Sequence, residues 1–256
     1  MCIRTYIFAA GIVTLMASPA FAAEDLIPPS ADGPFTLGGS LALTSEYFFR
    51  GLSQSDDKPA VQGGVTAAYK FSDSVSANAG VWVSNVDFAP DARVEVDFTA
   101  GLAGSVMDVS WTAGGIYYAY PGSENGGGTN EDFDFWELTG GLGYDFGLFS
   151  VGGSVNWTPS FQAGANQTDD SGTGWYLNAN VKVPVKYVDL VAAVGRQYVE
   201  DNTRWGVPDW TDYKLAVQAM VYGFGLEAAF IDTSLDDKRY TAAADKQFVF
   251  TVSKSF

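Results

Sequence analysis

The chain has 256 residues, with 30 acidic against 14 basic side chains, no histidine and a single cysteine, Cys2. Its formal net charge of −16 repels nucleic-acid phosphates, so we expect no nucleic-acid partner. Without an imidazole the sequence lacks the usual base of outer-membrane hydrolases, which excludes their mechanisms. Hydrophobic residues make up 47% of the chain, a share that fits either a soluble or a membrane protein. The order of these residues along the chain therefore has to distinguish the two classes.

The first 22 residues have the organisation of a secretory signal peptide. A basic residue, Arg4, precedes the apolar run 6–16, and small residues then lead to Ala20-Phe21-Ala22. The apolar run is too short for a spanning helix, which disfavours an uncleaved anchor. We expect cleavage after Ala22 or the next residue, loss of Cys2 with the signal, and a periplasmic lead-in over residues 23–34.

From residue 35 onward, apolar and polar residues alternate in successive runs. Because neighbouring strand residues point to opposite faces, a strand with lipid on one side and a wet lumen on the other has to alternate in this way. In the first run Leu41 and Leu43 oppose Thr44, and in a later one Val96 opposes Glu95 and Asp97. Twelve such runs follow one another, and the first residue expected to face outward in each is, in chain order, Leu37, Val61, Val75, Val94, Val109, Trp136, Phe149, Trp175, Val188, Tyr213, Phe224 and Phe248.

The links between these runs alternate between short and long. Tight links are expected near residues 72–74, 105–108, 145–147, 184–186 and 222–223, and long polar links at 51–58, 87–91, 121–130, 159–172, 200–208 and 233–245. An up-and-down barrel has short periplasmic turns and long outer loops. The pattern therefore predicts an all-β fold, a closed antiparallel up-and-down transmembrane β-barrel of about twelve strands over residues 35–256 in the cell outer membrane, with a β-sandwich as the alternative.

Aromatic residues gather near the ends of the expected strands, where they would form interfacial girdles in contact with outer-membrane lipid. The expected outer rim comprises Phe49, Phe133, Phe135, Trp157, Trp175, Tyr198 and Trp210. The expected periplasmic rim comprises Phe71, Trp111, Tyr144, Phe149, Tyr187, Phe224 and Phe256.

Charged residues on the inward face are the candidate functional residues. The predicted pore-lining set is Glu46, Arg50, Lys70, Arg93, Glu95, Asp97, Glu137, Lys182, Lys214 and Glu227. Opposite charges across a narrow bore order water and polar solutes, and a net ring charge selects ions. The same residues could instead pair with one another and plug the bore, and the sequence leaves both readings open. About twelve strands leave room for a small pore at most.

The last ten residues, QFVFTVSKSF, place apolar residues at alternate positions and end in Phe256. This resembles the C-terminal signal that the barrel-assembly machinery reads, although Lys254 departs from the apolar preference. The runs LTSEYFFRGLSQSDDKPAVQGG (43–64), VWVSNVDF (81–88), EVDFTAG (95–101) and IYYAYPG (116–122) resemble the Gcw_chp family of proteobacterial outer-membrane porins. The resemblance implies an outer-membrane channel and assigns no chemical role to the motif residues.

The leading functional hypothesis is a channel for passive diffusion of ions or small hydrophilic solutes through a narrow polar lumen. The alternative is a non-conducting structural or adhesion-type barrel whose acidic outer loops bind a partner. A catalytic carboxylate pair, Glu95 and Asp97, is a weaker third hypothesis, because charged residues are ordinary in a wet lumen. No motif points to a cofactor or to a metal site, so the protein is expected not to be an enzyme.

Overall fold

The structure is a computed structural model that describes residues 33–88, 92–123, 133–159, 161, 172–200, 202, 208–235 and 244–256. The predicted signal peptide, residues 1–22, and residues 23–32 of the predicted lead-in lie outside the described residues. In the described part of the chain, no helix is both long enough and apolar enough to cross a bilayer.

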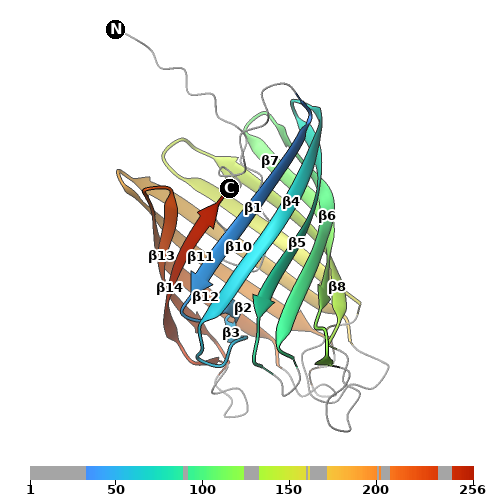
Figure 1. The fold of residues 1–256 in the computed structure, drawn as a ribbon, viewed down its shortest axis with the longest axis vertical. Coiled ribbons are helices and arrows are strands. Elements are labelled where there is room, and N and C mark those ends of the chain that lie inside the picture. Colours follow the sequence, from blue (N-terminus) through green and yellow to red (C-terminus); the bar gives the residue numbers. More distant parts are fainter. Residues whose placement is uncertain are drawn as a thin grey trace.

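Twelve antiparallel strands form a closed barrel, which confirms the predicted fold class (Figure 1). The barrel strands are β1 (Phe35–Thr44), β4 (Ala60–Ser72), β5 (Val75–Asn85), β6 (Val94–Val106), β7 (Val109–Ala119), β8 (Phe135–Asp145), β9 (Ser150–Thr158), β10 (Gly174–Val185), β11 (Val188–Val199), β12 (Trp210–Val221), β13 (Phe224–Thr233) and β14 (Gln247–Ser255). A separate hairpin pairs β2 (Phe48–Phe49) with β3 (Leu52–Ser53).

Closure of the sheet depends on β1, which pairs with β4 on one side and with β14 on the other. Leu41, for example, lies opposite Gly63 of β4 and opposite Lys254 of β14. Consecutive strands pair around the rest of the barrel, so none of the twelve has a free edge. Every strand can therefore satisfy its backbone hydrogen bonds within the sheet, as a bilayer requires.

Short turns connect the strands at the end of the barrel where β14 finishes (Figure 1). In three of these turns a residue other than glycine adopts a left-handed backbone conformation. They are Met107, Lys186 and Tyr222, with φ of 55°, 55° and 53°. Tyr222 is followed by Gly223 with φ of 75°, so the β12–β13 turn has two consecutive left-handed residues, as in a type I′ hairpin. The predicted tight links are thus confirmed at this end.

The outer surface of the barrel is apolar at alternate positions along each strand. Large apolar side chains such as Val61, Leu215 and Phe250 are 64%, 60% and 61% exposed, a degree that only lipid accommodates over a whole barrel. Lys254 is an outward exception, but its Nζ donates a hydrogen bond at 2.8 Å to the carbonyl of Gly223 and lies over the ring of Phe224. Its charge is thereby held at the membrane edge, as in other snorkelling lysines.

The predicted outer aromatic rim is correct in part. Trp157 contacts both Trp136 and Trp175 on the outward face, and Trp175 and Tyr198 are exposed there. Phe135 and Trp210, by contrast, are only 7% and 1% exposed and lie inside the barrel, so their assignment to the rim is wrong. Phe49 and Phe133 also pack against the internal aromatic cluster.

Candidate functional site

Residues 45–59, which we call the inward segment, leave the end of β1 and fold into the bore instead of projecting outward. Its hairpin, β2–β3, lies inside the ring of strands (Figure 1). The ring of Phe49 packs edge-on against Tyr118 of β7, and Tyr47 packs edge-on against Trp82 of β5. The expected long link at residues 51–58 does lie at the outer end, between β1 and β4. It differs from the expectation in its direction, because the segment begins at residue 45 and its hairpin folds into the bore, where Tyr47 and Phe49 contact distant strands.

The tip of the inward segment is a two-residue turn made by Arg50 and Gly51. Phe49 pairs with Leu52, and the two turn residues have φ of 51° and 78°, the left-handed pair that a tight hairpin turn requires. A non-glycine residue at positive φ is uncommon, and its strain is retained where surrounding contacts fix it. Gly51 also passes close to β12, where an added Cβ would lie 2.7 Å from the Cβ of Asp212.

The side chain of Arg50 extends from this turn to the opposite wall. Its Nη2 donates to Oε2 of Glu137 on β8 at 2.6 Å, and its Nη1 donates to Oε1 of Gln197 on β11 at 2.8 Å. The guanidinium also lies 4.3 Å from the ring centre of Tyr176 on β10. Burial lowers the pKa of Arg50, but the charge and hydrogen bond of Glu137, together with Tyr118 and Tyr176, raise it above its ordinary value, so the group stays charged.

The backbone of the turn is also held. Nε1 of Trp210 on β12 donates to the carbonyl oxygen of Arg50 at 2.9 Å. Glu137, on the far side of the pair, accepts two further hydrogen bonds at Oε2, from the hydroxyl of Tyr118 at 3.2 Å and from Nδ2 of Asn156 at 3.0 Å. The hairpin tip is consequently attached to six barrel strands, β7 to β12, of which β9 is reached only through Glu137.

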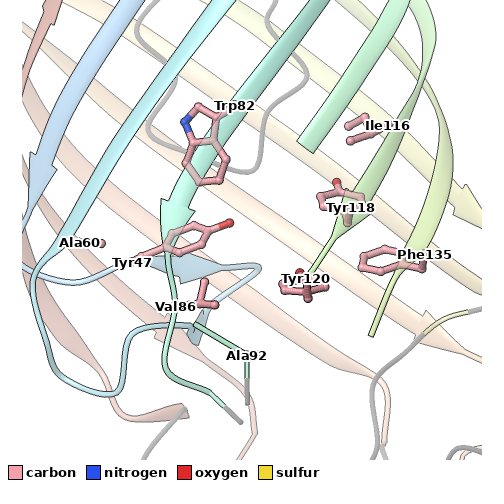
Figure 2. Close-up of a cluster of buried hydrophobic side chains, with 9 residues drawn as sticks. All are labelled: Tyr47, Ala60, Trp82, Val86, Ala92, Ile116, Tyr118, Tyr120 and Phe135. Atoms are coloured by element: carbon pink, nitrogen blue, oxygen red, sulfur yellow. The ribbon is translucent and has the colours of Figure 1, made fainter. Parts of the chain in front are cut away.

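A second group of contacts surrounds Tyr47 (Figure 2). The Tyr47 hydroxyl donates to Oε1 of Glu95 on β6 at 2.7 Å. Burial, reinforced by the charges of Glu95 and Asp97, raises the pKa of the Tyr47 hydroxyl well above its ordinary value, so it remains a donor. Buried aromatic and aliphatic side chains complete the cluster, namely Tyr47, Ala60, Trp82, Val86, Ala92, Ile116, Tyr118, Tyr120 and Phe135.

Three carboxylate oxygens in this region are buried and have no hydrogen-bond partner among the described residues. They are Oε2 of Glu95, Oδ1 of Asp97 and Oδ2 of Asp212. Asp212 is held on its other oxygen by the hydroxyl of Tyr176 at 3.1 Å. We refer to the inward segment together with the wall residues that it contacts as the constriction.

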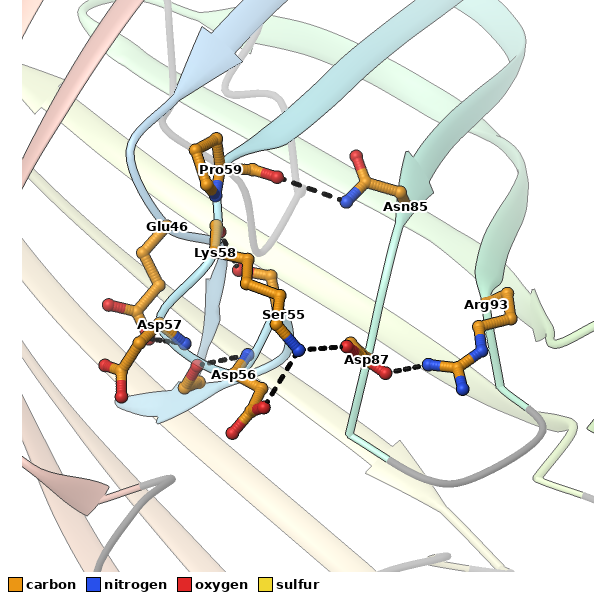
Figure 3. Close-up of polar contacts among 10 residues, drawn as sticks. Glu46, Ser55, Asp56, Asp57, Lys58, Pro59, Asn85, Asp87 and Arg93 are labelled. Atoms are coloured by element: carbon orange, nitrogen blue, oxygen red, sulfur yellow. Dashed lines mark hydrogen bonds and ion pairs between the residues drawn. The ribbon is translucent and has the colours of Figure 1, made fainter.

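The outer end of the inward segment is fixed by exposed ion pairs (Figure 3). Lys58 pairs with Asp56 at 3.0 Å and with Asp87, and Asp87 also pairs with Arg93. These groups are largely exposed, with 56% of the Lys58 side chain and 60% of the Arg93 side chain accessible, so each pair contributes little. The network orients the segment more than it stabilises it.

The half of the bore nearer the short turns has a different lining. Many of its inward positions carry short or polar side chains that are partly exposed, whereas Ala103, Ala229 and Ser253 are buried. The partly exposed ones include Thr66, Asn78, Thr99, Gly114, Gly143, Ser154, Asn180 and Ala193. Two ion pairs lie on this wall, Lys214 with Glu227 at 2.8 Å and Lys182 with Asp189 at 3.7 Å. The bore therefore combines a polar, partly exposed half with a packed constriction.

The predicted pore-lining residues separate into three groups. Glu46, Arg50, Glu95, Asp97 and Glu137 lie buried in the constriction. Lys214, Glu227 and Lys182 lie on the inward wall of the other half as neighbouring pairs. Lys70 and Arg93 lie at opposite ends of the barrel, paired with Asp73 of a turn and with Asp87 of an outer link, and the structure does not bring them to the buried carboxylates.

Several residues of the constriction were missed at the level of sequence. Tyr176, Gln197 and Asp212 follow directly from the alternation, because Trp175, Tyr198 and Tyr213 beside them are outward. Trp210 follows from the same alternation, because it lies two positions before Asp212 on β12, but its place near the strand end led to its assignment to the aromatic rim. In the described part of the chain, no group of three or more acidic, histidine or cysteine side chains is arranged to hold a metal ion.

A family model described as "Bacterial protein of unknown function (Gcw_chp)" matches residues 29–256. No curated protein matches the sequence. Among solved structures, the NanC porin has a TM-score of 0.52 and 8% identity, over 85% of this chain and 98% of that chain. The outer membrane channel DcaP of Acinetobacter baumannii has a TM-score of 0.49 and 9% identity, over 90% and 99%. The likeness to the first is one of fold, and the molecule is an outer-membrane β-barrel.

Proposed function

The chain belongs to the Gcw_chp family, and we propose that it is a narrow outer-membrane channel for passive diffusion of ions or small hydrophilic solutes. The observation that carries this proposal is the contrast within the bore. A filled barrel would need bulky side chains along its whole length, whereas the inward wall near the short turns carries residues such as Thr66, Ser154 and Ala193, which are partly exposed.

The inward segment would set the size and the charge of what passes. It is a single hairpin attached by polar contacts, chiefly the Arg50 ion pair and the Trp210 hydrogen bond. Water can replace polar contacts of this kind. A hairpin held by them can therefore be displaced more easily than a packed apolar core. We assign no catalytic role to Glu95 and Asp97, because a carboxylate pair that acts on a substrate needs a groove beside it, and both side chains are buried in the constriction.

The second candidate, a non-conducting plugged barrel, is favoured by one specific observation. The side chains of Arg50 and Glu137 are only 2% and 1% exposed, so the constriction is closed to water at this pair. Under this alternative the inward segment is a plug and the protein acts through its outer loops.

Reconstitution of the purified full-length barrel in planar bilayers and in liposomes distinguishes the candidates. We expect discrete small conductance steps and uptake of small but not large sugars by the wild type, and larger steps for Arg50→Asn. Asparagine tolerates the left-handed turn conformation, so this variant keeps the turn but removes the guanidinium contacts with Glu137 and Gln197. Lys186→Asn is the matched control, because Lys186 is also cationic and left-handed, with φ of 55°, but lies in a short turn remote from the constriction.

Each outcome has a defined meaning. Conductance in the wild type supports the channel. If the wild type does not conduct and Arg50→Asn does, the plugged alternative is supported. The proposed channel is overturned if no conductance is found for the wild type, for Arg50→Asn or for a variant lacking the inward segment, provided that all three are correctly folded.

A further inference from the structure

We propose that Glu95 and Asp97 form a binding site for small monovalent cations within the constriction, and that the barrel consequently passes cations in preference to anions. The preference for cations rests on the proposed channel function, whereas the binding site can be tested without it.

The first support is the balance of charge among the described residues of the constriction. Glu137 is neutralised by Arg50, whereas Glu46, Glu95, Asp97 and Asp212 have no ion-pair partner in that part of the chain. The other inward charges form local pairs, Lys214 with Glu227 and Lys182 with Asp189, so they leave no comparable excess. A narrow, poorly hydrated passage with excess negative charge attracts cations and repels anions.

The second support is independent of the charge count. Oε2 of Glu95 and Oδ1 of Asp97 are buried and have no hydrogen-bond partner among the residues that the structure describes, and the two residues are only 1% and 5% exposed. A buried acceptor left unsatisfied costs free energy, and a charged one costs more. The two residues are two positions apart on one strand, so both side chains point into the bore about 7 Å apart along β6. A cation between them supplies the interaction that both oxygens lack.

Neighbouring aromatic residues fit the same ligand. The Tyr47 hydroxyl donates to Oε1 of Glu95 at 2.7 Å, and the Tyr120 hydroxyl also interacts with this carboxyl group, so that its position is fixed. Tyr47 and Trp82 lie edge to face with ring centres 5.5 Å apart, and Tyr118 and Tyr120 belong to the same cluster (Figure 2). Ring faces attract cations and offer nothing to anions.

The site suits a transient monovalent ion more than a tightly held metal. Two carboxylates provide fewer ligands than Ca²⁺ or Mg²⁺ takes, and no group of three candidate metal ligands occurs in the described residues. Conduction also requires binding that is weak enough for the ion to leave. Potassium is therefore a suitable probe.

The experiment compares the wild type with the double variant Glu95→Gln and Asp97→Asn. Both replacements keep the shape of the side chain and remove its charge. The matched control is Asp73→Asn with Asp108→Asn, which removes the same charge from two exposed turn residues at the other end of the barrel. In a potassium chloride gradient, we expect the wild type and the control to prefer K⁺ over Cl⁻, and the double variant to lose about threefold or more of that permeability ratio.

A second measurement tests the site without conductance. The midpoint of thermal unfolding is compared in potassium chloride and in N-methylglucamine chloride, whose cation is too large for the constriction. We expect K⁺ to raise the midpoint of the wild type and of the control, and not that of the double variant, because ligand binding to the folded state stabilises it.

The two proposals fail in different ways. A conducting barrel without K⁺ preference, or with a preference that the double variant retains, overturns the cation site and leaves the channel intact. A barrel that does not conduct overturns the proposed channel function. The cation site is then tested by the unfolding midpoint alone, and it is overturned if K⁺ does not raise that midpoint.

Discussion

Arg50 and Glu137 form a buried ion pair, with 2.6 Å between Nη2 and Oε2, although 87 positions separate them in the chain. One partner is at the tip of a hairpin that follows β1, and the other projects inward from β8, so the pair connects the inward segment to the far wall. Removal of one partner from a buried pair is costly, because the other charge remains buried alone.

The first prediction concerns this coupling. Hydrogen exchange of the amides of residues 45–59 should show that Arg50→Asn lowers the local opening free energy by about 3 kcal/mol, since Glu137 is left uncompensated. The double variant Arg50→Asn with Glu137→Gln should lose less than the sum of the two single variants. Additive losses would mean that the pair does not hold the segment.

The second prediction concerns Trp210, whose Nε1 binds the Arg50 carbonyl at 2.9 Å. Trp210→Phe keeps an aromatic ring and removes the donor, at a cost of about 1 kcal/mol. Trypsin added to the intact barrel should then cleave after Arg50 about fivefold faster than in the wild type, as detected by mass spectrometry of the fragments. Trp175→Phe is the control on the lipid face, and an equal acceleration there would contradict the role of Trp210.

Alternation along the strands was enough to predict most of the fold. It located the barrel strands and the inward orientation of Glu95, Asp97 and Glu137, because each strand has lipid on one face. The direction of the inward segment was not predictable in this way. The alternation of Tyr47 and Phe49 with Glu46 and Arg50 continues the first run and predicts a strand up to Arg50, whereas β1 ends at Thr44 and Tyr47 is only 2% exposed. The inward course of the segment depends on contacts between Arg50 and residues such as Gln197, 147 positions away.

The misplacement of Trp210 has a related physical cause. An aromatic residue near a strand end fits a lipid girdle, and this position was given more weight than the alternation. Trp210 lies two positions before Asp212 and therefore on the inward face, where its Nε1 reaches the backbone carbonyl of Arg50. The sequence did contain one usable signal, the Arg50-Gly51 dipeptide between short apolar runs, which is compatible with a tight hairpin turn.

The third prediction concerns Gly195, which lies between Tyr176 and Asp212 on neighbouring strands. A Cβ at this position would overlap the Tyr176 hydroxyl and the Asp212 carboxylate. Gly195→Ala should therefore displace their hydrogen bond and destabilise the barrel by about 1–3 kcal/mol in urea unfolding. Gly140→Ala is the control, since its nearest neighbours would be 3.8 and 4.0 Å away, and an equal loss in both variants would contradict the overlap.

The fourth prediction concerns Glu46 at the start of the inward segment. Burial raises the pKa of its carboxyl above the ordinary 4.5, and the charges of Asp57 and Asp56 add to this, although hydrogen bonds from Ser53 and Asp57 oppose it. A raised pKa in the folded state means that the contribution of Glu46 to stability is fully present below 4.5 and is lost as the pH rises through the folded value.

Glu46→Gln imitates the protonated form and should remove this dependence. We expect the midpoint of thermal unfolding of Glu46→Gln to exceed that of the wild type at neutral pH, and the difference to vanish in acid. A difference that grows on acidification would have the wrong sign and would contradict the assignment of burial as the main cause.

The most direct test is the single-channel conductance of Arg50→Asn relative to Lys186→Asn and the wild type, in the same bilayer and salt. The account predicts a larger unit conductance for Arg50→Asn alone, because the Arg50 side chain, unlike that of Lys186, attaches the inward segment across the bore. Equal conductance in all three proteins, or a larger conductance in Lys186→Asn, would contradict it.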